Sequence, residues 1–172
     1  MDLRDLPETP KGMFKLAAIA ASIVVLIISG VFFYSGKSIL VLVDGYQLNL
    51  RGNFFTGFLT IGSFLLSLKT FIVVKLKEGV YDSADYKKRF AEQNPDNSKA
   101  DIYAPLKNIS HLLFGTILSS LITAIFHVTL GLLDYWWAIL ICIFSVVFSI
   151  VLLLISLVLI RSNIVMWLTP NE

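Results

Sequence analysis

Four long apolar runs constrain this chain more than any other feature. They extend from about Met13 to Tyr34, Phe54 to Val74, Ile109 to Leu133 and Tyr135 to Ile160. Each run is long enough to cross a hydrocarbon core, which takes about 20 helical residues. Because a helix satisfies its own backbone hydrogen bonds in lipid, the runs predict an all-α membrane protein, with four transmembrane helices in a single membrane domain, 1–172.

The composition agrees with this fold class and excludes several kinds of function. The 172 residues are 56% hydrophobic and only 15% charged, whereas soluble domains have about 25% charged residues. The sequence has no zinc-binding helix motif, nucleophile elbow or phosphate-binding glycine loop. We therefore expect no enzyme activity, no catalytic residues, no metal site, no cofactor and no direct binding of nucleic acid. Cys142 is the only cysteine, so an intramolecular disulfide is excluded.

The distribution of Lys and Arg predicts the topology. Seven of them lie between the second and third runs, over residues 75–108, and the N-terminal tail and the end of the fourth run add more. The segment between the first two runs has only Lys37 and Arg51, and the last connection has none. By the positive-inside rule, both termini and loop 75–108 are cytoplasmic in a multi-pass protein of the inner (plasma) membrane.

The segment between the first two runs, "SILVLVDGYQLNLRG" over 38–52, contains a hairpin signal. Asp44-Gly45 is a favoured two-residue turn, and the residues after it alternate between apolar and polar. We expect a small extracytoplasmic β-hairpin that pairs with copies of itself or recognises a ligand. The alternative is a first helix that continues to Val43, against which Ser35-Gly36-Lys37-Ser38 argues because it breaks the run.

Polar and small residues form stripes on the apolar runs. On the third run they recur every four residues and drift about 40° per step; they are His111, Gly115, Ser119, Thr123, His127 and Gly131. On the second run they step by four and three; they include Thr56, Thr60, Ser63 and Ser67. Such stripes either allow close helix packing, within one copy or between copies, or line a polar path through an oligomer.

His127 is the ionisable residue that lies deepest in the third run. An ionisable group inside a membrane is costly unless it is paired, and it suggests a function. Two interpretations of His127 are open. In one it senses pH or conducts protons; in the other it forms a hydrogen bond with Ser or Thr on a neighbouring helix.

The loop "DSADYKKRFAEQNP" reads as a short helix capped by Asp82 or Ser83 and stopped at Asn94-Pro95. Tyr86 and Phe90 share one face, and three cations lie between them: Lys87, Lys88 and Arg89. This helix either lies on lipid headgroups or docks a soluble cytoplasmic effector.

The layout resembles the membrane component of Kiwa-type anti-phage defence systems. The resemblance covers the short N-terminal tail, "KTFIVVKLKEGVYDSADYKKRF" after the second run, "YAPLKNIS" before the third, and the lack of enzyme motifs. It implies a homo-oligomeric inner-membrane sensor that holds a soluble effector on its cytoplasmic face. Two other functions remain open: a small pore or channel lined by the third-run stripe, and an immunity or accessory protein that binds another membrane protein.

Overall fold

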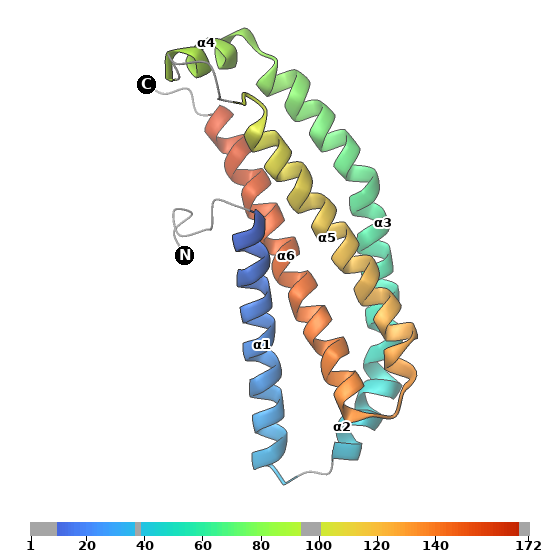
Figure 1. The fold of residues 1–172 in the computed structure, drawn as a ribbon. Coiled ribbons are helices and arrows are strands. Elements are labelled where there is room, and N and C mark those ends of the chain that lie inside the picture. The colour runs from blue at the N-terminus through green and yellow to red at the C-terminus, as the bar shows by residue number, and fades with distance from the viewer. Residues whose placement is uncertain (1–9, 37–38, 94–100, 169–172) are drawn as a thin grey trace.

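Four long helices make up the protein (Figure 1). The structure is a computed structural model and describes residues 10–36, 39–93 and 101–168. The order of elements is α1 (Pro10–Tyr34), α2 (Ile39–Gly45), η2 (Tyr46–Leu50), α3 (Arg51–Leu76), η3 (Lys77–Tyr81), α4 (Ala84–Gln93), α5 (Ala104–Val128), η4 (Leu130–Leu132) and α6 (Trp136–Leu168). The prediction of an all-helical membrane protein with four helices long and apolar enough to span a bilayer is confirmed.

The helices differ from the predicted runs mainly at their ends. The third span begins at Ala104, with Pro105 in its first turn, where a missing N–H costs nothing. The fourth continues to Leu168, eight residues beyond the predicted end. The first ends at Tyr34, and Gly36 has a φ of +60°, which confirms the predicted break there because this conformation favours glycine.

The prediction of a β-hairpin over 38–52 is wrong. Residues 39–50 are helical, as α2 and η2, and the helix continues into α3, so no strand occurs in the described residues. Gly45 has helical angles, φ −61° and ψ −40°, and Asp44 lies exposed on α2, so they make no turn.

Local hydrogen bonds explain why the helix forms. Asn49 Nδ2 donates to Gly45 O at 3.2 Å, and Arg51 Nη1 donates to Gln47 Oε1 at 2.5 Å, so the polar residues of the supposed strand pair at helical spacing. An isolated hairpin would be marginal, whereas the helix buries Val43 and Tyr46 against the rest of the chain.

One helical rod therefore runs from Ile39 to Tyr81, with a π-helical segment on each side of α3. α3 packs on α5, α5 also packs on α6, and α1 packs mainly on α6. We call the end of the bundle with Gly36 and Asp134 the turn end, and the end with α4 the loop end. Figure 1 shows α4 lying across the loop end.

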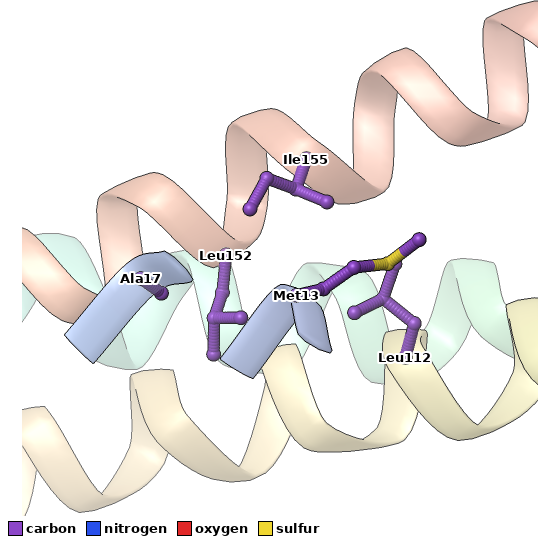
Figure 2. Packing of buried hydrophobic residues seen from close by; sticks show 5 residues of the cluster. All are labelled: Met13, Ala17, Leu112, Leu152 and Ile155. Carbon is purple, nitrogen blue, oxygen red and sulfur yellow. The ribbon is translucent and has the colours of Figure 1, made fainter. Parts of the chain in front are cut away.

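Small residues allow α1 to approach the bundle. Ala17 and Ala21 are fully buried, and Met13 and Ala17 join Leu112 of α5 and two α6 residues in one cluster. Figure 2 shows this cluster, with Leu152 and Ile155 as the α6 members.

Candidate functional site

A histidine enclosed by aromatic rings lies near the turn end of the bundle. His127, in the last turn of α5, is 0% exposed. The ring of Tyr46, from η2, meets it edge to face at 5.9 Å between centroids, and Phe54, from α3, does so at 5.3 Å. Cys142 of α6 is buried in the same cluster as Tyr46. We call Tyr46, Phe54, His127, Gly131 and Cys142 the histidine cage.

Gly131 is required by the shape of this cage. A Cβ atom at position 131 would lie 2.7 Å from Tyr46 Oη, closer than side chains pack. Gln47 Nε2 donates to Gly131 O at 2.8 Å, and Gln47 is in turn bonded to Arg51. The π-helical segment is thus fastened to the turn between α5 and α6, and π-helical segments often occur at functional sites.

Three buried polar atoms in the cage have no hydrogen-bond partner in the described residues: Tyr46 Oη, His127 Nδ1 and His127 Nε2. Each buried atom of this kind costs about 1–3 kcal/mol, and native structures rarely contain one without a reason. A protonated His127 would gain only about 0.5–2 kcal/mol from the aromatic faces, against several kcal/mol for burying an ion. The cage therefore holds a neutral imidazole that is closed off from the surface of the protein.

The predicted hydrogen bond between His127 and a neighbouring Ser or Thr does not occur among the residues that the structure describes. Hydroxyl groups instead form a seam between α5 and α6, at positions of α5 that precede His127. Thr123 Oγ1 lies 2.8 Å from Ser149 Oγ, Ser119 Oγ lies 2.6 Å from the same atom, and Thr116 Oγ1 lies 2.7 Å from Ser156 Oγ. These bonds hold the two central helices together.

The third-run stripe winds from the surface into the interior, as its spacing predicts. His111 is exposed, Gly115 packs on Phe14 of α1, and Thr123, His127 and Gly131 are buried. A groove of about 380 Å³ beside α5 is lined by Gly115, Ser119 and Thr123 together with mostly apolar side chains. Within one copy the stripe thus serves packing, and this gives the pore alternative no support.

The second-run stripe lies on the other side of α3, away from the bundle. Thr56, Thr60, Ser63 and Ser67 are all exposed. The hydroxyl groups of Thr56 and Thr60 donate to carbonyl groups one turn earlier in the same helix, at 2.9 and 2.8 Å. α3 instead approaches α5 at Gly62, where a Cβ would lie 2.9 Å from Leu121 Cδ2.

The residues predicted to dock a partner divide into two groups. Lys87, Lys88 and Arg89 are exposed on α4. Tyr86 faces the bundle: its ring meets Tyr81 edge to face at 5.0 Å and stacks on Phe90 at 6.2 Å. Its hydroxyl group donates to Ile102 O at 3.2 Å.

Tyr81, Tyr86, Tyr103 and Asp82 form what we call the loop-end collar. Ser83 Oγ accepts from the Tyr86 N–H at 3.3 Å, so Ser83 caps α4 as predicted. Tyr103 Oη donates to Asp82 Oδ1 at 2.7 Å, which lowers the pKa of Asp82 below its ordinary value and raises that of Tyr103. Asp82 is ionised at neutral pH. The stability contributed by the hydrogen bond from Tyr103 to the Asp82 carboxylate is lost only when the pH falls through the lowered pKa of Asp82.

Sequence reasoning missed the partners of His127. The hairpin prediction places Tyr46 in a strand and gives Gln47 and Arg51 no role. The signal available was the four-residue spacing between Gln47 and Arg51, which favours a helix. The described residues contain no group of three His, Cys, Asp or Glu side chains that could hold a metal ion.

Comparison with models of protein families, with curated proteins and with solved structures gives no match for this chain.

Proposed function

We propose that this protein is a non-enzymatic membrane sensor or scaffold that transmits a change at the turn end to a partner at the loop end. The observation that carries the proposal is the single helical rod from Ile39 to Tyr81. The rod supplies Tyr46 and Phe54 to the histidine cage and Tyr81 to the collar. The resemblance to Kiwa-type membrane components supports a role in anti-phage defence, which a phage challenge of cells lacking only this gene tests.

The two π-helical segments provide the means of transmission. Each contains about one residue more per turn than α3, the α-helix that lies between them, so a π-helical turn could move by one residue into or out of α3. Such a step rotates the intervening helix by about 100° and shifts it by about 1.5 Å. A change at η2 would then reach η3 and α4 through α3.

The coupling is tested by Gly131→Ala, because the added methyl group would displace Tyr46 from the cage. Hydrogen–deuterium exchange in a lipid nanodisc should then become faster over Lys77–Gln93, by about tenfold or more. Gly57→Ala, which adds a methyl group to α3 where nothing lies within 4 Å, should leave this exchange unchanged. Faster thiol labelling of Cys142 in Gly131→Ala without any change over Lys77–Gln93 would disprove the coupling.

We place the loop end in the cytoplasm, where exposed Lys88 and Arg89 present positive charge to a soluble effector. The positive-inside bias of residues 75–108 supports this orientation. A cysteine at position 88, in a Cys142→Ala background, should react with a membrane-impermeant maleimide only after the membrane is permeabilised. A cysteine at exposed position 134 should react in cells whose outer membrane has been opened by osmotic shock while the inner membrane stays sealed. The reverse pattern would place the termini outside.

We propose that copies associate through the exposed hydroxyl row of α3. The hydroxyl groups of Thr56, Thr60 and Ser67 donate to carbonyl groups of their own helix, so a second helix could approach without leaving these three unpaired. Thr60→Leu combined with Ser63→Leu should reduce the native mass in detergent to that of one copy. Ser22→Leu on exposed α1 is the matched control and should keep the assembly. An unchanged mass in the double variant would indicate that this row faces lipid.

A further inference from the structure

In the described residues, no carboxylate is among the side chains that enclose His127, so no negative charge is available to pair with a charged imidazole. η2 contributes Tyr46 and α6 contributes Cys142, both un-ionised side chains of the buried cluster. The neighbouring charged side chain is Arg51, whose Cγ would lie 3.5 Å from a Cβ on Gly131 and which would repel a second cation. The nearby carboxylates of Asp44 and Asp134 are exposed. Neither imidazole nitrogen has a partner in the described residues.

The closed cage therefore accommodates only the neutral form of His127. A histidine in water binds a proton at about pH 6.5. If the cage opens and water reaches the ring, the open state can hold His127 as either the neutral or the protonated imidazole. The closed state holds only the neutral imidazole. Each pH unit below about 6.5 then raises the ratio of open to closed protein about tenfold.

We infer that the histidine cage is an acid-operated latch: a proton from the turn-end side binds His127, and the cage opens by releasing Tyr46 from Gly131 and uncovering Cys142. The opening itself rests on the cage geometry alone. Its use as an input signal rests on the proposed function.

Cys142 reports on the latch without any engineering, because it is the only cysteine and is 0% exposed. The full chain in a nanodisc is treated with an aromatic disulfide that modifies thiols at acid and neutral pH. Its rate is divided by the rate for the denatured protein at the same pH, which removes the change in thiol reactivity. Between pH 7.5 and 5.0 the corrected rate should rise roughly 30-fold, from the tenfold change per pH unit.

Two substitutions assign the response to His127. His127→Phe keeps a ring of similar size but cannot bind a proton, so the corrected rate should not depend on pH; His127→Leu is the second such variant. The only other histidine, His111, is exposed, so His111→Gln should retain the full response. A flat profile in the wild type, or a persistent response in His127→Phe, overturns the latch.

A second measurement covers the case in which both His127 variants fail to fold. In His111→Gln, the remaining imidazole is followed by NMR with isotope-labelled histidine. The charged form should appear with the same pH midpoint as the labelling of Cys142. A charged imidazole that appears while Cys142 stays protected would also overturn the latch.

The latch and the proposed coupling can fail separately. Exchange over Lys77–Gln93 is recorded at both pH values and divided by the exchange rate of the unstructured chain at the same pH. At pH 5.0 the collar is not itself disrupted, because the pKa of its Asp82 lies below the ordinary 3.8. Acid labelling of Cys142 without faster exchange at the loop end keeps the latch and rejects the coupling. Faster exchange in Gly131→Ala, with no effect of acid on Cys142, keeps the coupling and rejects the latch.

Discussion

Tyr46→Ala is expected to lower the free energy of unfolding by about 3 kcal/mol, whereas Tyr46→Phe should cost nothing or stabilise the protein. Tyr46 is 1% exposed, and deleting a buried aromatic ring costs about 3–5 kcal/mol in soluble proteins. The lower value applies here because lipid replaces water as the alternative environment. In the described residues Tyr46 Oη makes no hydrogen bond of ordinary geometry, and its polar neighbour is the Cys142 thiol, a weak partner, so removal of the hydroxyl group relieves a poorly satisfied buried group.

The free energy of unfolding of both variants is measured in mixed lipid and detergent, with steric trapping to detect the unfolded protein. Tyr135→Ala, at a ring that is 58% exposed at the turn end, is the control and should change stability by less than about 0.5 kcal/mol. If Tyr46→Phe destabilises as much as Tyr46→Ala, the hydroxyl group makes an essential hydrogen bond, for instance to a buried water molecule, and the description of the cage is wrong.

Ser149→Leu should be the most damaging substitution in the seam between α5 and α6. The Ser149 hydroxyl contacts both Ser119 and Thr123 and is 0% exposed. Loss of these bonds alone, as in Ser149→Ala, should cost about 0.6–1.7 kcal/mol, as found for hydrogen bonds between membrane helices. A leucine adds overpacking of about 1–3 kcal/mol, for a total of about 2–5 kcal/mol.

The same unfolding measurement decides this prediction. Ser22→Leu is the matched control: Ser22 is exposed on α1 and bonds only to Ala18 O of its own helix. Equal stability of Ser149→Leu and Ser22→Leu would show that this face of α6 does not pack on α5.

The four spans and the break at Gly36 were predictable because they depend on local properties. Continuous hydropathy fixes where a helix can cross lipid, and a glycine between two apolar runs supplies the reversal. The winding of the third-run stripe was also predictable, since four residues exceed one helical turn by a fixed angle. Its two ends accordingly contact different neighbours, Phe14 at Gly115 and Tyr46 at Gly131.

The hairpin was predicted wrongly because Asp44-Gly45 and the alternation after it are signals of short range. The contacts that favour the helix, between Tyr46, His127 and Gly131, join positions more than 80 residues apart. Sequence also could not tell which stripe packs inside one copy. Both carry hydroxyl groups at suitable spacing, and α3 meets α5 at Gly62, off the hydroxyl row.

The length of the rod from Ile39 to Tyr81 has a consequence for the bilayer around it. Forty-three helical residues extend about 60 Å, while a bilayer with its headgroups is about 40–45 Å thick. An upright rod would stand out into water on at least one side, and a rod contained in the bilayer would tilt by about 40°. Membrane thickness thus sets either the tilt of this helix or the exposure of its two ends, near Tyr46 and Tyr81, to water.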